Sequence, residues 1–421
     1  MYQRQMFQRD IFMTRKIIVF CVLCLYCLFT SLTCKKEEKP KTIHELQKLD
    51  LSKKEKDEDY EFFWGFIKEG FPFTEVLERN GVDLKKIKEE WYPKLKDIET
   101  KSQYLTFYDE LCAEITQNKP VGHLWGIAYE QYNSVYKKFY PCVNEDGKEN
   151  ELIKNFYMAR PTGAWVPHIW QDVHVIDGII TNIIEEGKIA CLRIDSFSIT
   201  GQKILNDVKV FLEKTKDYKH LIIDITRNGG GNSYFWMYIA GLLLKDDAEF
   251  YQYGLYTENK YTKELLEYAF KTYNIEIINK DTIPNVKNAN TTHKNGCKRC
   301  KTIKKVDGIT NSIDERKIWL LVSSKSHSAA DQFAGFCRQT GFATVVGENT
   351  AGAGMSVIGP LPIPLPKSGA LILFDSTYAL NTEGMSNTEF GTAPDIHVKD
   401  GQVPMQACME AIREYDAKEK K

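Results

Sequence analysis

The chain has 421 residues, of which 43% are apolar and 27% are charged. This composition is typical of a globular protein with a large core, and the length suggests two or three domains. With 56 basic and 57 acidic residues mixed along most of the chain, the formal net charge is −1. Such a sequence lacks the basic footprint that nucleic-acid binding requires, so we expect no nucleic-acid partner.

Residues 1–33 are predicted to be a signal peptide. Basic residues precede an apolar run over residues 17–32, which is short for a membrane span of about 20 residues. The run ends at Cys34, and a charged segment follows. This resembles a bacterial lipoprotein signal in which Cys34 becomes the lipidated first residue. We therefore expect an exported, membrane-anchored lipoprotein at the periplasm or cell surface. A simple cleaved secretory peptide stays open, because Leu32 lies two rather than three residues before the cysteine.

Next along the chain we expect a charged linker over residues 34–59 and an N-terminal helical domain over 60–125. Apolar residues there recur at helical spacing, as in Tyr104, Phe107, Tyr108 and Leu111. From residue 170 short apolar runs predict strands. The pair Asp177-Gly178 is a hairpin signal. We therefore interpret residues 126–185 as a strand-rich connecting region.

The remaining chain predicts an α/β core over residues 186–405. Apolar runs that are typical of buried strands, at 189–194, 221–225 and 318–322, alternate with amphipathic helical patterns. Residues 250–315 are polar and irregular, so we interpret them as an insertion or an elaborated loop. A C-terminal helix is expected over residues 406–421.

Three segments could carry chemistry. The strand over residues 221–225 runs into Gly229, Gly230 and Gly231, where backbone N–H groups could turn toward an anion. Ser328 follows another strand at the start of a helix, where its hydroxyl could be an exposed nucleophile or only a helix cap. His123 stands between Gly122 and aromatic residues and could be catalytic or a buried structural histidine.

Taken together, these segments resemble the tail-specific, or C-terminal processing, serine peptidase family, which also includes the tricorn protease core. The order of motifs along the chain carries the resemblance: Gly122-His123, the strand ending in Arg227-Asn228-Gly229-Gly230-Gly231, the junction 326–331, residues 346–352, and residues 391–396. The resemblance implies an α/β fold of the crotonase-like ββα spiral type behind an N-terminal helical domain. It also implies hydrolysis of peptide bonds in a peptide or protein substrate, with no cofactor and no metal.

The resemblance assigns a role to each site residue. Ser328 would be the nucleophile. The branch that uses a Ser-Lys dyad places its Lys at the position of Ala353, so the tricorn-like branch fits better. In that branch His123 would be the general base, and Glu389 would support it, with Glu383 as the rival carboxylate. The oxyanion donors would be the backbone N–H groups of Gly230 and Ala329, with Gly231 as an alternate.

Several further residues and functions allow other interpretations. His293, Cys297 and Cys300 could bind zinc, but one cysteine pair supplies too few ligands for a structural site, so a disulfide or free thiols fit better. His327 adjoins Ser328 but should point elsewhere. Between His123 and the predicted hairpin the chain is too short for a full PDZ domain. The alternatives to a peptidase are a non-catalytic binding protein on the same scaffold and a hydrolase of a non-peptide ester.

Overall fold

The computed structural model describes residues 46–119, 121–158, 178–198, 201–286, 292–306 and 315–419. The chain divides into residues 1–48 and a second compact unit, 49–421, which contains every element discussed below. The predicted signal peptide and Cys34 lie outside the described residues, as does the first strand of the hairpin predicted around Asp177-Gly178. Among the residues described, no helix is both long enough and apolar enough to cross a bilayer.

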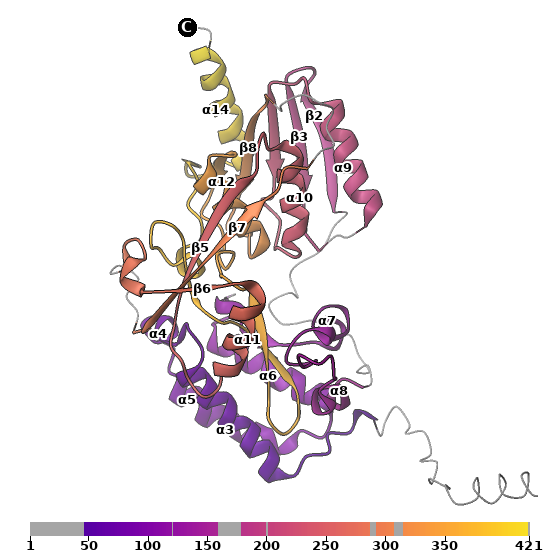
Figure 1. Cartoon of the computed structure of the whole chain (residues 1–421), viewed down its shortest axis with the longest axis vertical. Coiled ribbons are helices and arrows are strands. Elements are labelled where there is room, and N and C mark those ends of the chain that lie inside the picture. The colour runs from indigo at the N-terminus through magenta and orange to yellow at the C-terminus, as the bar shows by residue number, and fades with distance from the viewer. Residues whose placement is uncertain are drawn as a thin grey trace, which may run out of the picture. The chain divides into compact units, whose positions relative to one another are not determined.

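An aromatic-rich group of helices opens the second unit, as the sequence predicts (Figure 1). Its members are α3 (Lys53–Glu69), α4 (Thr74–Arg79), α5 (Leu84–Trp91), η1 (Tyr92–Asp97) and α6 (Lys101–Ile115). Capping boxes start α3 at Ser52 and α6 at Thr100, where a side chain at the third helical position bonds back to the cap. The first helix therefore begins inside the stretch that we expected to be a linker. Rings such as those of Tyr60, Phe63 and Tyr108 pack edge to face in its core.

A six-stranded sheet forms the α/β core, which confirms the predicted fold class. Its order is β13-β9-β8-β4-β3-β2, parallel except for the antiparallel edge strand β2. The strands are β2 (Ile179–Glu185), β3 (Ile189–Ile194), β4 (His220–Asp224), β8 (Lys317–Val322), β9 (Thr344–Gly347) and β13 (Ile396–His397). Both faces of the parallel strands are covered, which explains their nearly continuous apolar runs.

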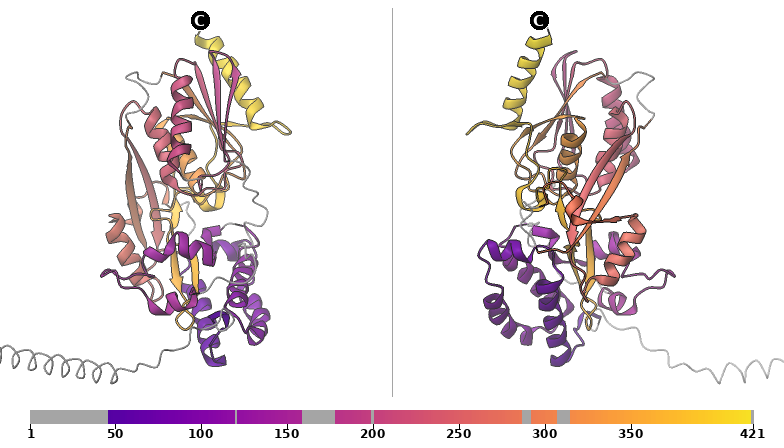
Figure 2. Two further views of the ribbon diagram at one scale, coloured as in Figure 1. Left: turned by 90° about the vertical axis from the view of Figure 1, so that its right-hand side faces the viewer. Right: turned by 60° about the vertical axis from the view of Figure 1, so that its left-hand side comes forward.

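Helices cover the two faces of this sheet unequally (Figure 2). One face packs against α9 (Gln202–Lys214), α10 (Ser233–Leu243) and α12 (Ala329–Thr340). The other face packs against α14 (Pro404–Glu419), drawn in yellow, which overlaps the helix expected over residues 406–421. Buried residues alternate along β4 accordingly, with Leu221 and Ile223 facing α9, α10 and α12, and Ile222 facing α14.

Residues 250–315 are more ordered than we expected. They contribute most of a second sheet, of order β12-β5-β7-β6, together with the helix α11 (Lys263–Tyr273). Its strands are β5 (Ala248–Tyr256), β6 (Glu276–Ile278), β7 (Asn295–Ile303) and β12 (Tyr378–Leu380). Polar residues on both strands of the long β5–β7 pair interrupt the apolar runs that would predict these strands. The pair buries one face against α10 and α12.

The connecting region also differs from our prediction. Described residues up to 158 form α7 (Tyr129–Ser134), η3 (Tyr136–Lys138) and α8 (Glu151–Phe156) rather than several strands. The end of this region forms β2 (Ile179–Glu185), while β1 (Trp125–Gly126), at its start, belongs to a third sheet of order β1-β11-β10. Its partners come from late in the chain, β10 (Pro360–Pro364) and β11 (Leu371–Asp375). This sheet ties the segment that follows the N-terminal helices to the C-terminal third of the chain.

Asp59 fixes the tip of the β10–β11 hairpin to the N-terminal helices. Its buried carboxylate accepts the backbone N–H groups of Lys367 and Ser368 at 2.7 and 3.0 Å, and the hydroxyl of Tyr104 at 3.1 Å. Burial raises the pKa of Asp59, and these hydrogen bonds oppose that shift. Three protein donors therefore take the place of water around the buried Asp59 carboxylate.

We expect Asp59→Ala to lower the free energy of unfolding by about 2–4 kcal/mol, because one buried and one partly buried N–H group and a buried phenol lose their acceptor. Urea unfolding followed by circular dichroism measures the change. The matched control is Asp57→Ala. Among the described residues the Asp57 carboxylate bonds only the exposed phenol of Tyr92, so its loss should cost less than about 1 kcal/mol. Equal losses in the two variants would contradict this assignment.

Candidate active site

The carboxyl ends of β4 and β8 bring two of the predicted segments together. The two strands are parallel neighbours, so the loops that follow them leave the same edge of the sheet. Gly230 has φ +104°, and a Cβ placed on it would lie 2.9 Å from the Cβ of Ser328 and 3.1 Å from the backbone N of Ala329. The glycine turn thus lies directly against the serine, closer than any side chain would permit.

Ser328 occupies the N-cap position of α12, but it does not act as a cap. Its side chain accepts no hydrogen bond from the helix, and its backbone has φ +54° and ψ −116°. A non-glycine residue in this region is strained by about 1–3 kcal/mol and is held there by its surroundings. Its N–H donates to the carbonyl of Gly352 at 2.9 Å. The hydroxyl is therefore left for another partner.

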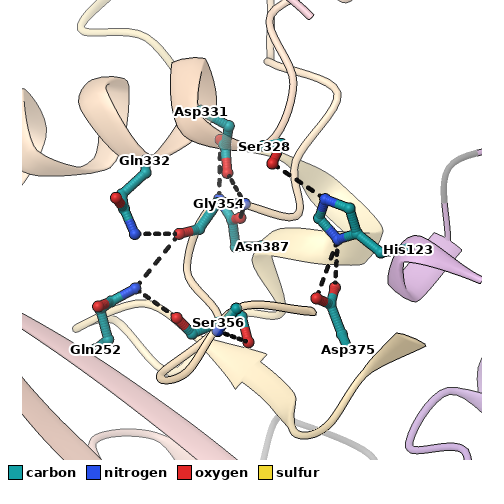
Figure 3. A network of polar contacts seen from close by, with 10 residues as sticks. His123, Gln252, Ser328, Asp331, Gln332, Gly354, Ser356, Asp375 and Asn387 are labelled. Carbon is teal, nitrogen blue, oxygen red and sulfur yellow. Dashed lines mark hydrogen bonds and ion pairs between the residues drawn. The ribbon is translucent and has the colours of Figure 1, made fainter. Parts of the chain in front are cut away.

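That partner is the ring of His123. The distance from His123 Nε2 to Ser328 Oγ is 3.0 Å (Figure 3). His123 ends the short helix η2 (Val121–His123), in which Gly122 and His123 both have positive φ, +62° and +48°. This left-handed pair turns the chain so that the buried imidazole, 3% exposed, points at the serine. The structure brings together two residues that are 205 positions apart in the sequence.

The carboxylate in contact with His123 is that of Asp375, which the sequence analysis did not identify. Both Asp375 oxygens lie 3.0 Å from His123 Nδ1, and the carboxylate is fully buried. Strand register explains this contact. Trp125 of β1 pairs with Leu373 of the antiparallel β11, so His123, two residues before Trp125, faces Asp375, two residues after Leu373. A charged residue closing the wholly apolar run 370–374 was the one available signal.

The prediction for Glu389 is therefore corrected. Its carboxylate is held 2.7 Å from the guanidinium of Arg79 and also accepts the hydroxyl of Tyr378. Glu389 lies on α13 (Asn387–Phe390) and joins that helix to α4 rather than to His123. The rival, Glu383, is exposed and pairs with Arg338. Neither carboxylate is bonded to the histidine.

The oxyanion donors expected at Gly230 and Ala329 have different surroundings. The N–H of Gly230 already donates to the side-chain oxygen of the buried Asn228 at 2.8 Å. Within the described part of the chain, by contrast, the N–H groups of Ala329 and Gly231 have no acceptor. Ala329 opens α12, where N–H groups point out of the helix end and favour negative charge. Its N–H is free to receive an oxyanion, whereas that of Gly230 has a competing partner.

Asp331, one turn into α12, anchors the loops around the serine (Figure 3). Its fully buried carboxylate accepts the hydroxyls of Thr350 and Thr392, the amide of Asn387 at 3.1 Å, and the N–H of Gly354 at 2.7 Å. Burial raises the pKa of Asp331, and these four donors oppose the shift. The network fixes the loop that contains Ala353, the position where a Ser-Lys enzyme would carry its lysine.

The remaining candidate residues are engaged elsewhere. The ring of His327 lies 5.1 Å from that of His123, centroid to centroid, and it is not bonded to Ser328. Cys297 is buried on β7 and Cys300 is exposed on the same strand, and both are free thiols. His293 bonds the carbonyl of Pro72 at 2.8 Å. Within the described ranges, no three His, Cys, Asp or Glu side chains are grouped to hold a metal.

Gly122 provides a test of how His123 is positioned. A Cβ at Gly122 would lie 2.6 Å from the ring of Phe73 and 2.9 Å from that of Phe71. We expect Gly122→Ala to cost about 3 kcal/mol of stability, from overpacking and positive φ, and to lower kcat by displacing His123.

The control is Gly187→Ala. Gly187 has a similar φ of +65° but open space around it, so the change should cost about 1 kcal/mol and leave kcat intact. Thermal unfolding and peptide hydrolysis measure both quantities. Equal loss of activity in the two variants would show that the phenylalanine rings do not govern the histidine.

Comparisons with known proteins add a family and a set of similar structures. Residues 188–398, about half of the chain, match the family described as peptidase family S41. That span includes the glycine turn, Ser328 and Asp375 but not His123. No curated protein matches the chain.

Among solved structures, one from Parabacteroides merdae, named as a candidate peptidase, is 18% identical, with a TM-score of 0.49 over 85% of this chain and 96% of that one. A lipoprotein from Streptococcus agalactiae is 13% identical, with a TM-score of 0.46 over 87% and 99%. The photosystem II D1 C-terminal processing protease is 13% identical, with a TM-score of 0.41 over 83% and 94%.

Proposed function

The chain belongs to peptidase family S41 and is a serine peptidase, and from this premise we propose that Ser328, His123 and Asp375 are its catalytic triad. The observation that carries the proposal is the continuous contact from the buried Asp375 carboxylate through His123 to Ser328 Oγ, with 3.0 Å at each step. This is hydrogen-bond reach for a nucleophile, its base and the group that orients the base.

In the proposed acylation step, Ser328 Oγ attacks the scissile carbonyl while His123 Nε2 takes the hydroxyl proton. Asp375 accepts a hydrogen bond from the N–H at Nδ1, so it fixes the tautomer in which Nε2 is the acceptor, and it stabilises the imidazolium that forms. The carbonyl oxygen becomes an oxyanion, and we assign the N–H of Ala329 as its first donor. The second donor would be Gly231, or Gly230 once Asn228 releases it.

The same residues complete the cycle. Collapse of the tetrahedral intermediate breaks the C–N bond, and His123 gives its proton to the leaving amine. Water then attacks the acyl-enzyme, with His123 again as the base, and the product acid leaves Ser328. No step requires a group beyond these side chains, the backbone donors and water.

We also propose that the enzyme is exported and anchored through lipidated Cys34. The support is the sequence itself, a basic start followed by the apolar run 17–32 and a charged segment after Cys34. In a bacterial host, a fatty-acid analogue should label the protein, and Cys34→Ala should abolish the label. Labelling that survives this change would contradict a lipoprotein at Cys34.

A fluorophosphonate probe tests the catalytic proposal, because it reacts with serines that are activated by a neighbouring base. We expect a single labelled peptide containing Ser328, and cleavage of a peptide library at amide bonds. Labelling without amide cleavage would point to a hydrolase of other esters. An absence of both would point to a binding protein on a peptidase scaffold.

A further inference from the structure

Two cations on the inward face of β7 lie beside the catalytic loops. Arg299 and Lys301 alternate with outward residues along the strand, so their side chains share one face about 7 Å apart. On β5 their direct partners are Gln252 and Phe250, both fully buried. Neither cation forms an ion pair with any residue that the structure describes.

Both cations are partly buried. The Arg299 guanidinium donates to the carbonyl of Val357 at 3.2 Å and lies over the ring of Tyr273 at 5.2 Å. Burial lowers the pKa of Arg299. Burial, with the charge of Arg299 as a second cause, lowers the pKa of Lys301 to about 7. Two half-buried cations without a counter-ion are costly for the fold, and a bound carboxylate would offset that cost.

One set of contacts connects this face to the nucleophile. Gln252, opposite Arg299, donates its amide to the carbonyls of Gly354 and Ser356, at 3.4 and 2.7 Å (Figure 3). Gly354 is bonded in turn to Asp331 on the helix that begins at Ser328. The acceptor of Arg299, Val357, is the next residue of the same loop. The β7 cations and Ser328 therefore flank one short, fixed segment.

We propose that Arg299 and Lys301 form a subsite for a carboxylate of the substrate, and that they make the peptidase selective for acidic peptides. The carboxylate would come from an Asp or Glu side chain or from the C-terminus of the peptide. Arg299 can bind it through two parallel N–H groups, while Lys301 adds a point charge. This assignment rests on the proposed function, since it treats the face beside Ser328 as part of a peptide-binding cleft.

The test uses fluorescein-labelled octapeptides of one neutral sequence, made as matched pairs. In one set a Glu or a Gln occupies each position in turn, and in the other the C-terminus is a free acid or an amide. Binding is measured by anisotropy to the Ser328→Ala protein, which cannot turn the peptides over. We expect the acid member of one set to bind about 10- to 100-fold more tightly than its neutral partner. The set that shows the preference identifies the source of the carboxylate.

Adding Arg299→Gln or Lys301→Gln should remove most of that preference and leave binding of the neutral peptides within about twofold. The control is Lys298→Gln, because Lys298 lies on the outward face of β7 and pairs with Glu276. Equal binding of both members of every pair overturns the subsite, and this comparison needs no cation variant to fold. A cation variant that weakens the binding of acid and neutral peptides equally also overturns the subsite. If the wild-type enzyme cleaves neither member of any pair, the proposed function fails instead.

Discussion

Replacing Ser328 by alanine should lower kcat for peptide hydrolysis by about 10⁴- to 10⁶-fold, with the fold retained. Within the described ranges the hydroxyl has one partner, His123 Nε2, and caps no helix N–H, so its loss removes the nucleophile without removing a structural bond. Hydrolysis of a fluorogenic peptide from the cleaved library measures the rate, and thermal unfolding measures the fold. Stability should change by less than about 1 kcal/mol.

A variant of the neighbouring Ser326 is the structural control for this experiment. Its buried hydroxyl donates to the carbonyl of Ile225 at 2.8 Å and accepts the N–H of Ser323 at 3.1 Å. Ser326→Ala should therefore cost about 1–3 kcal/mol of stability while the folded enzyme stays active. Residual activity of the Ser328→Ala variant above about 1% of wild type, in protein free of contaminating peptidase, would reject Ser328 as the nucleophile.

The sequence identified Ser328, His123 and the glycine turn because each is marked locally. A serine after an apolar strand, a histidine after a glycine, and three consecutive glycines are patterns within a few residues. Their order along the chain then matched one peptidase family. What brings them together, the parallel pairing of β4 with β8 and the antiparallel pairing of β1 with β11, is non-local and has no single marker in the sequence.

Asp375 escaped prediction for a physical reason. An aspartate at the end of an apolar run is usually solvated or starts a turn, and only the pairing of β11 with β1 places this one against a histidine 252 positions earlier. The prediction of Glu389 rests on its resemblance in position to the glutamate that the tricorn-like branch carries near the C-terminus. In this chain, Arg79 supplies that carboxylate with a closer partner. The sequence alone does not show which of two acidic residues contacts the histidine, because the partners of both come from distant elements.

Strands β5 and β7 escaped prediction for a related reason. The β5–β7 pair carries Gln252, Arg299 and Lys301 on its inward face, so its strands lack the clean apolar alternation that predicts a half-buried sheet. If those polar groups serve the substrate, as we propose for the two cations, the strand pattern is lost because of function. Local rules are expected to fail most at such sites.

Replacing Asp375 by asparagine should lower kcat by about 10⁴-fold and leave KM within a few-fold. An asparagine amide in this position donates a hydrogen to His123 Nδ1, so the ring carries its proton on Nε2 and cannot take the proton of Ser328. The carboxylate is fully buried and the substitution is isosteric, so the geometry should persist. Steady-state kinetics with the same fluorogenic peptide measures both parameters. Fluorophosphonate labelling of Ser328 should slow in parallel.

The two rejected carboxylates complete the experiment. Glu383→Gln changes an exposed side chain and should leave kcat within about twofold of wild type. Glu389→Gln weakens the bridge from Arg79 to α13, and since that helix packs on η2 we expect a loss of less than about 10-fold, accompanied by lower stability. A larger loss from Glu389→Gln than from Asp375→Asn would reverse the assignment, and it would mean that the histidine changes its carboxylate partner during turnover.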